Sequence, residues 1–347
     1  MKPFPELTLV QSVAHTLSSR ARIHTLAKIP VPERARAKVK EFPLYGFSIG
    51  SEEPTAPVLG IVGGVHGLER IGSQVVLSSL ISWVERLHWD ETLMRDLEHF
   101  RLVVVPILNP VGMFMESRSN GNGVDLMRNA PVDAEDKTHF LMGGHRITNR
   151  LPWYRGLAGA PMELENQVLC EFIKKESFQS EFSLWLDVHS GYGIHDRLWF
   201  PYAKSTRPFP HLPESFALKT LFDRTYPYHV YQIEPQSHEY TTHGDVWDYI
   251  YEQRHHGLVD HGVGPLLMPL TLEMGSWAWI KKNPLQLFSF LGPFNPIKPH
   301  RKKRILRRHL NFFDFLMRAV MNHSVWSRPS TEERGELLRA AMAHWYA

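Results

Sequence analysis

The sequence is poor in cysteine. Cys170 is the only cysteine among 347 residues, which excludes internal disulfides and cysteine-rich zinc modules and fits a reducing compartment. The chain has 20 histidines, so imidazole nitrogens and carboxylate oxygens are the side-chain ligands available in quantity for a metal ion. Any metal site is therefore expected to consist of His and Asp or Glu residues.

Long apolar runs and a strong excess of one charge are also absent. No stretch of about 18 apolar residues exists to form a transmembrane helix. The 39 Lys and Arg against 36 Asp and Glu leave a net charge of +3, which gives no reason to expect a nucleic-acid or membrane partner. Residues 1–22 lack the apolar core of a secretory signal, so we expect a cytoplasmic location.

Short apolar runs alternate with longer helix-like patterns, which predicts an α/β fold with helices on both faces of a mixed or mostly parallel sheet. The nearly continuous apolar runs, typical of buried strands, are 43–49, 58–64, 102–108, 182–188, 197–202, 229–233 and 266–273. The helix-like patterns are 71–87, 163–175, 214–225 and 245–255, with 10–27 also compatible with a helix. Ligand sites in such sheets lie at the carboxyl ends of strands, so the residues that end these runs are the candidates.

Three segments are expected along the chain. Residues 1–40 form an N-terminal lead-in, 41–290 the main domain, and 291–347 a basic, amphipathic helical extension. The extension is expected to pack its Leu and Phe stripe on the domain and to leave its basic residues in water. Contact of these basic residues with an acidic partner is the alternative.

A His-x-x-Glu pair can supply two metal ligands, and the sequence contains three such pairs. Chance alone predicts about two His-x-x-acid matches in a chain of this composition, so context must decide between them. His88 lies near the end of an amphipathic helical pattern and His211 lies between two prolines, so both pairs are interpreted as surface features. His66 instead ends an apolar run and Glu69 opens the next helix, although a hydrogen-bonded strand-end histidine is the alternative for His66 alone.

Two other buried runs also end in groups that carry chemistry. His189 follows the run 182–188, and Glu273 follows the run 266–272. Two His and one Glu can hold a catalytic zinc ion with the fourth position open to water, and a further Glu suits a general base. Asp187 projects to the same side of its strand as His189 and could accept a hydrogen bond from an imidazole, although an ordinary buried polar contact explains it equally well.

A loop rich in Gly and Asn follows the run 102–108 and contains Arg118 and Arg128. A guanidinium suits the stabilisation of an oxyanion and the bidentate binding of a carboxylate, although either arginine taken alone is more often a surface residue. Further along, residues 240–249 are typical of a mobile turn that leads into a helix, with Tyr240 able to close over a substrate.

Together and in this order, these motifs resemble those of the zinc carboxypeptidases of the carboxypeptidase A type. The matching residues are Gly63-Gly64-Val65-His66-Gly67-Leu68-Glu69, Asn109-Pro110-x-Gly112, Arg118, Gly123-Val124-Asp125-Leu126-x-Arg128-Asn129, His189-Ser190 and Thr271-Leu272-Glu273. The resemblance spans roughly residues 55–280. It implies an α/β/α sandwich with a mixed, roughly eight-stranded sheet, and hydrolysis of a C-terminal peptide bond.

The resemblance also implies how the reaction is catalysed. His66, Glu69 and His189 would bind one Zn²⁺ per chain, Glu273 would act as the general base, and Arg118 would stabilise the oxyanion.

Further residues are implied to bind the substrate. Arg128 would hold the terminal carboxylate of a peptide, with Asn129 and the mobile Tyr240 as additional contacts. Trp247 falls where the family lines its specificity pocket, which favours an apolar substrate side chain unless Trp247 only packs the start of a helix.

One departure from the family concerns the residue before Arg128. The family usually has Asn there, whereas this chain has Met127, and a thioether cannot donate a hydrogen bond to a carboxylate. The form His66-Gly67-Leu68-Glu69 is also similar to bacterial murein-peptide amidases and to the aspartoacylase and succinylglutamate desuccinylase branch. A zinc-dependent amidase or deacylase that acts on N-acyl amino acids or murein peptides is therefore the alternative to a carboxypeptidase.

Two other classes of protein are less well supported. Gly46-Phe47-Ser48-Ile49-Gly50 fits the nucleophile elbow of serine hydrolases, but another strand rather than a helix follows it, which favours a hairpin. A non-catalytic binding protein on the same fold is the remote alternative, since no metal-ligand or base position is lost.

Overall fold

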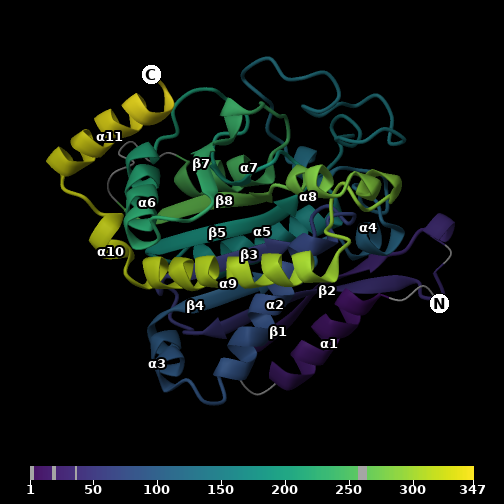
Figure 1. Cartoon of the computed structure of the whole chain (residues 1–347), viewed down its shortest axis with the longest axis horizontal. Helices are drawn as coiled ribbons and strands as arrows, with labels where there is room; N and C mark the ends of the chain where they lie inside the picture. The colour runs from purple at the N-terminus through teal and green to yellow at the C-terminus, as the bar shows by residue number, and fades with distance from the viewer. Residues whose placement is uncertain (1–3, 18–20, 36, 257–263) are drawn as a thin grey trace.

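A mixed eight-stranded β-sheet lies at the centre of the computed structural model (Figure 1). The structure describes residues 4–17, 21–35, 37–256 and 264–347. The strands lie side by side in the order β1-β2-β4-β3-β5-β8-β6-β7. Their bounds are β1 Arg22–Pro30, β2 Glu41–Gly50, β3 Val58–Gly63, β4 Arg101–Val105, β5 Phe182–Ser190, β6 Asp196–Phe200, β7 Tyr231–Pro235 and β8 Leu266–Met274.

Helices flank this sheet, as the predicted α/β fold requires (Figure 1). The α-helices are α1 Pro5–Leu17, α2 Arg70–Arg86, α3 Glu91–His99, α4 Pro110–Met115, α5 Leu164–Ser177, α6 Leu212–Thr225, α7 Val246–His255, α8 Trp277–Lys282, α9 Pro299–Met321, α10 His323–Trp326 and α11 Thr331–Trp345. Short 3-10 helices are η1 Glu33–Ala35, η2 Leu126–Arg128, η3 Gln236–His238 and η4 Pro284–Phe288.

The four central strands, β4, β3, β5 and β8, run parallel, and every residue in them is buried. Burial on both faces explains why these segments are continuous apolar runs in the sequence. Parallel strands bring their carboxyl ends to one edge of the sheet, and the β5–β8 register places His189 directly opposite Glu273. The outer strands β2 and β6 pair antiparallel to this central group, which makes the sheet mixed.

The first 40 residues are more than a lead-in, because β1 is an edge strand that pairs antiparallel with β2. Residues 10–27 are compatible with a helix by pattern, yet α1 ends at Leu17 and the chain is extended from Arg22. Most of β1 is only half-buried, so it lacks the continuous apolar run that marks the central strands. The predicted boundary at residue 40 therefore separates two strands of one sheet.

The possible serine elbow at Gly46–Gly50 lies inside β2, which pairs with β1 on one side and β4 on the other. A nucleophile elbow must turn from a strand directly into a helix, so this segment is not one.

The interpretation of His211 and Glu214 as surface features is wrong, because both side chains are buried. His211 Nδ1 lies 2.7 Å from the Tyr251 hydroxyl, and Glu214 accepts a hydrogen bond from Arg334 Nε at 2.8 Å. The prolines around His211 lead into α6, and α11 packs over this helix and covers the pair.

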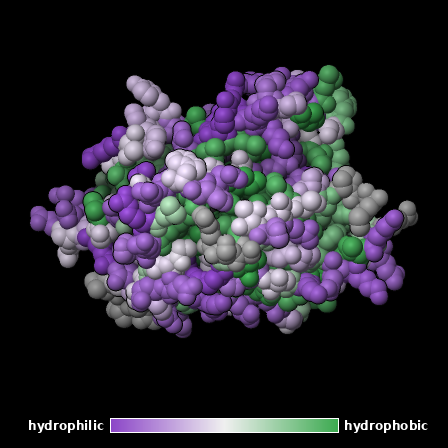
Figure 2. All heavy atoms as spheres, turned by 90° about the horizontal axis from the view of Figure 1, so that it is seen from below, coloured by the Kyte–Doolittle hydropathy of each residue, from purple (hydrophilic) through white to green (hydrophobic). Residues whose placement is uncertain are grey.

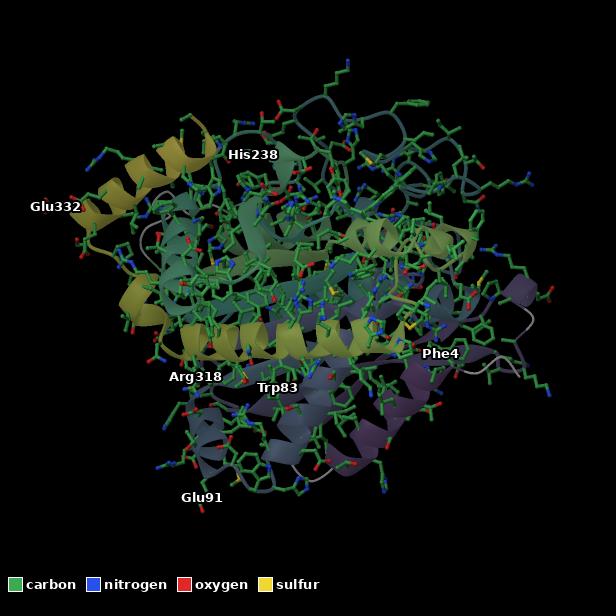
Figure 3. The ribbon with its side chains drawn as sticks, viewed as in Figure 1. Phe4, Trp83, Glu91, His238, Arg318 and Glu332 are labelled. Carbon is green, nitrogen blue, oxygen red and sulfur yellow. The ribbon has the colours of Figure 1, made fainter. Side chains whose placement is uncertain are left out.

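The C-terminal segment packs on the central sheet and its helices through α9. Helix α9 contacts α2, β3 and β5, and the rings of Trp83 on α2 and Phe313 on α9 stack with centroids 6.3 Å apart; Trp83 is labelled in Figure 3. Within the described residues, no helix has the length and apolar character needed to cross a membrane. The cytoplasmic location stays a prediction.

The surface in Figure 2 is largely hydrophilic, with hydrophobic side chains gathered in patches between polar ones. Single exposed apolar residues are normal on a protein surface, whereas a contiguous group of them indicates a contact site.

Cys170 is buried on α5, where burial raises the pKa of its thiol to about 12.

Candidate active site

The sequence-predicted ligands His66, Glu69 and His189 come together at the carboxyl edge of the sheet. One ligand atom from each residue lies within 4.8 Å of the other two, and all three side chains are buried. The closest pair is His189 Nδ1 and Glu69 Oε2, 3.2 Å apart. Among the described residues, this group has the composition expected for a catalytic zinc site.

The chain reaches this geometry through a tight turn after β3. Gly64 has a φ of +67°, and a side chain there would strike Ser73 Oγ at 2.4 Å. The amide of Glu69 then donates to the carbonyl of His66 at 3.0 Å, which holds both ligands on one turn. A side chain on Gly67 would lie 2.0 Å from the backbone of Gly112, so only glycine allows this turn to pack on the neighbouring loop.

Burial prepares His66 to bind a cation. It lowers the pKa of His66 to about 4, so the imidazole is neutral at physiological pH and has a free lone pair. Its Nδ1 atom is buried without a hydrogen-bond partner and lies 3.8 Å from Asp125 Oδ1. A buried nitrogen left without a partner beside a carboxylate ligand fits a metal ligand, and the set of two imidazoles and one carboxylate suits Zn²⁺.

His189 is held on both sides by carboxylates. Its Nε2 atom lies 2.8 Å from Asp187 Oδ2, on the side away from Glu69. Burial by itself lowers the pKa of His189, but the negative charges of Asp187 and Glu69 outweigh burial and raise it well above its usual value. Asp187 therefore acts on His189 through its negative charge, and its role in orienting the imidazole stays a prediction.

Glu273 projects from β8 into the same cavity and is not one of the three clustered ligands. Its Oε1 atom accepts a hydrogen bond from the Tyr192 amide at 3.0 Å. Burial and then the charge of Glu69 raise the pKa of Glu273 to about 8 in the metal-free protein. A carboxylate with a raised pKa is a stronger base, as the predicted role requires.

Arg118 lies beside the triad and is fixed from two directions. Its Nε donates to Asp125 Oδ2 at 2.8 Å, and its Nη1 lies 3.6 Å from Glu69 Oε1. The guanidinium carbon lies 5.8 Å from the centre of the Trp153 ring. These contacts hold a permanent cation at the edge of the cavity.

Arg128 and Tyr240 form another part of the cavity wall. Arg128 Nε and Nη1 donate to the carbonyls of Met142 and Met127, both at 3.1 Å, which fixes the plane of the guanidinium. The Tyr240 ring centre lies 5.9 Å from the Arg128 guanidinium carbon. A side chain on Gly244 would lie 1.9 Å from the Arg128 carbonyl oxygen, so only glycine allows this close contact. The turn that carries Tyr240 therefore packs directly on the loop that carries Arg128.

These residues surround a cavity of about 650 Å³. It is lined by His66, Glu69, Arg118, Met127, Arg128, Met142, Trp153, His189, Ser190, Gly191, Tyr192, Gly193, Ile194, His195, Arg197, Trp199, Gln236, Glu239, Tyr240, Thr271, Glu273, Trp277 and Phe294. The size suits a small ligand or the end of a longer one.

Comparison with known proteins agrees with this geometry. A family model described as zinc carboxypeptidase, peptidase family M14, matches residues 8–286. This chain belongs to the zinc carboxypeptidase family. The match begins within the predicted lead-in and ends close to the predicted end of the catalytic domain.

Two relatives illustrate the family. Carboxypeptidase SOL1 of Arabidopsis thaliana is 33% identical over 97 residues, which cover 27% of this chain and 20% of that protein. The carboxypeptidase N catalytic chain of Rattus norvegicus is 30% identical over 175 residues, which cover 45% of this chain and 35% of that protein. The matched part is thus well under two thirds of either relative.

Among solved structures, the carboxypeptidase A of Helicoverpa armigera superposes with a TM-score of 0.62 at 15% identity, covering 90% of this chain and 71% of that one. At this identity the likeness shows a shared fold.

Two residues that the family resemblance assigned to substrate binding do not line the cavity. Asn129 donates from Nδ2 to the Arg155 carbonyl at 3.0 Å and accepts from the Glu163 amide at 2.6 Å, so it joins two loops. Trp247 is buried, and its Nε1 donates to Asp187 Oδ2 at 2.9 Å. Trp247 thus holds the carboxylate that lies beside His189, and it does not line the cavity where an apolar specificity pocket was expected.

An Arg–Glu network in the cavity wall was missed from the sequence. Arg197 Nη2 donates to Glu239 Oε1 at 3.0 Å, and the Tyr192 hydroxyl donates to Glu239 Oε2 at 2.7 Å. The register pairs Arg197 with Glu273 and Trp199 with Thr271, so these two β6 side chains share a face with the base. The alternation of side chains along 197–199 indicates that Arg197 and Trp199 share a face of the strand. Placing that face beside Glu273 requires knowing that β6 pairs with β8.

Proposed function

We propose that this chain is a zinc-dependent metallocarboxypeptidase that removes the C-terminal residue of a peptide. The observation that carries the proposal is the single cavity into which the triad, Glu273, Arg118 and Arg128 all project. Family membership supports the same activity.

His66, Glu69 and His189 are the residues that would hold the zinc ion. Bound zinc supplies Lewis acidity, which polarises a substrate carbonyl and makes a water molecule more acidic. Asp187 and Trp247 keep the His189 ring in position for this role.

Glu273 accepts the proton that the attacking water loses, at a carboxylate oxygen, and then delivers it to the nitrogen of the departing residue. The hydrogen bond from the Tyr192 amide to Oε1 fixes the orientation of this carboxyl group. The same group can serve as base and then as acid because its protonated form is also stable in this buried site.

The two arginines stabilise charge at opposite ends of the scissile bond. Arg118 donates hydrogen bonds to the oxyanion that develops on the carbonyl oxygen. Arg128 binds the terminal carboxylate, and Tyr240 lies against its guanidinium to close this end of the cavity.

A digest of a peptide library, read by mass spectrometry, tests the activity. We expect removal of single C-terminal residues that stops when a chelator is added and resumes when zinc is restored. Internal cleavage, or turnover that a chelator does not affect, would contradict the proposal.

One observation favours a second candidate, an amidase of the bacterial murein-peptide type or a deacylase of N-acyl amino acids. Met127 lines the cavity beside Arg128, and its thioether offers no donor to a terminal carboxylate. The glycine of His66-Gly67-Leu68-Glu69 supports the same branch. Equal cleavage of peptides with free and amidated C-termini would favour this candidate and leave the metal chemistry unchanged.

A further inference from the structure

Basic residues are concentrated in one segment of the chain. Residues 274–313 contain nine of the 39 Lys and Arg of the chain and none of its 36 Asp and Glu. The small net charge of +3 therefore combines a strongly basic segment with a remainder that is net acidic. The segment comprises α8, η4 and α9 as far as Phe313, and Figure 1 shows α8 above the right-hand end of α9.

The cations of this segment gather around a second cavity of about 300 Å³. Its basic lining residues are His195, Lys282, His300, Arg301, Arg304 and Arg308. Among the described lining residues the one carboxylate is Asp196, which already accepts from the Gly275 amide at 3.0 Å and from Arg308 Nη1 at 2.7 Å. Lys282, His300 and Arg304 are exposed, so this cavity presents positive charge to an external ligand.

A group of exposed apolar side chains lies between Lys282 and His300, on the loop that joins α8 to α9. The most exposed are Phe288 at 89%, Leu285 at 73% and Phe290 at 73%, with Leu287 and Ile297 also exposed. Large apolar side chains in such number on one short loop are costly in water and indicate a contact surface. Lys282 and His300, which flank this loop on its two sides, line the basic cavity.

The loop has a fixed internal structure that keeps these side chains outside. Gln286 is fully buried, and its Nε2 donates to the carbonyls of Gly292 and Asn295 at 2.6 and 2.8 Å. Asn295 in turn donates to the carbonyl of Leu68 at 2.7 Å and accepts from the amide of Ile71 at 2.9 Å. A polar residue fills the inside of the loop while its Leu and Phe neighbours face water, which is the reverse of ordinary packing.

We propose that the apolar loop 283–297 and the basic cavity at its base together form a docking surface for an anionic lipid bilayer. The Phe and Leu side chains enter the boundary between headgroups and acyl chains, and the cations meet the lipid phosphates. A second copy of the chain fits this surface poorly, because a symmetric contact would set two acid-free basic segments against each other. The inference is independent of the proposed peptidase activity.

The docking surface adjoins the catalytic cavity. Trp277 at the start of α8 and Phe294 in the loop both line that cavity, and the Phe294 carbonyl accepts a hydrogen bond from Ser190 Oγ, next to His189, at 2.8 Å. Binding to a bilayer would therefore place the active site next to the lipid surface. The sequence-based expectation of no membrane partner rested on the net charge, which averages the basic segment with the acidic remainder.

Co-sedimentation of the full-length protein with vesicles tests the proposal. We expect the protein to sediment with mixed phosphatidylglycerol and phosphatidylcholine vesicles, to remain in solution with phosphatidylcholine alone, and to be released by high salt. Equal binding to both kinds of vesicle, or binding to neither, would overturn the proposal. Self-association in place of vesicle binding would overturn it as well.

Matched variants locate the surface. Phe288→Ser with Phe290→Ser, and separately Lys282→Glu with Arg304→Glu, should each weaken binding to the anionic vesicles at least about tenfold. The controls are Phe140→Ser, which removes a side chain that is 84% exposed elsewhere, and Arg339→Glu on α11; both should bind like the unaltered protein.

Two outcomes would refute the proposed docking surface. Unaltered vesicle binding in both double variants refutes the docking surface, as does equal loss in the controls. Thermal unfolding and cleavage of a peptide in solution should be unchanged in every variant, which shows that a loss of binding does not arise from misfolding.

Discussion

Replacing Glu273 by Gln should make the metal-free protein more stable near neutral pH, although it slows turnover. The amide oxygen of Gln can still accept the hydrogen bond from Tyr192, so the fold has no reason to change. What the substitution removes is an ionisable group in a buried site next to the Glu69 carboxylate.

The size and sign of the effect follow from the pKa of Glu273, which burial and Glu69 raise from 4.5 to about 8. The folded protein keeps a proton that the unfolded chain has already lost between these values, so Glu273 makes stability fall as pH rises through this window. At 1.36 kcal/mol per pKa unit, the cost at pH 7 is about 3 kcal/mol. At pH 4 the side chain is mostly neutral in both states, and the cost nearly vanishes.

Urea unfolding of both proteins, treated with a chelator, at pH 4 and pH 7 measures this difference. We expect Glu273→Gln to be more stable by about 3 kcal/mol at pH 7 and equal to the unaltered protein at pH 4. With zinc bound, the gain should shrink because a nearby dication favours the carboxylate. Equal stability at both pH values, or a gain that does not depend on pH, would refute the reasoning.

The remaining predictions concern catalysis and binding. Glu273→Gln should lower kcat by about 10² or more without changing the zinc content measured by metal analysis. Arg128→Ala should raise KM at least about tenfold for peptides with a free C-terminus and leave amidated peptides unaffected, since a charge-assisted hydrogen bond contributes about 1.5–3 kcal/mol. Arg118→Ala should lower kcat about 10²-fold or more with little change in KM, as steady-state kinetics will show.

The central sheet could be predicted from the sequence because its strands are buried on both faces. The runs that became β3, β5 and β8 are continuous in apolar residues, and the parallel arrangement then brings His66, His189 and Glu273 to one edge. Edge strand β1 was missed for the opposite reason, since half-burial leaves no continuous run. A sequence pattern therefore predicts a strand only where burial on both faces requires a continuous apolar run.

The finer parts of the site depend on side-chain direction, which spacing does not specify. Asn129 lies next to Arg128 in sequence, yet its amide bonds to the Arg155 loop and not to the cavity. Arg197 lines the cavity because β6 inserts antiparallel beside β8, a topology that no short motif encodes. Local sequence motifs thus predict which residues lie near the site, whereas the pairing of strands and loops decides which of their side chains face the cavity.

The role of Trp247 can be tested by experiment, because its sequence position suggested a contact with the substrate whereas its tertiary contact is with Asp187. As a positioning residue it acts through Asp187, because its indole N–H donates to the carboxylate oxygen that lies 2.8 Å from His189 Nε2. Trp247→Phe keeps a large aromatic ring and removes this donor. We expect zinc affinity, measured by competition with a chelator, to fall about tenfold or more, since partners of metal ligands typically contribute 10- to 100-fold.

The same variant, once saturated with zinc, should cleave the same range of C-terminal residues as the unaltered protein. The indole is buried and does not line the cavity, so the substrate side chain does not meet it. A changed side-chain preference with unchanged zinc affinity would place Trp247 in the specificity pocket after all. Lower affinity with unchanged preference would show instead that this tryptophan acts on the metal ligand His189 through the carboxylate of Asp187.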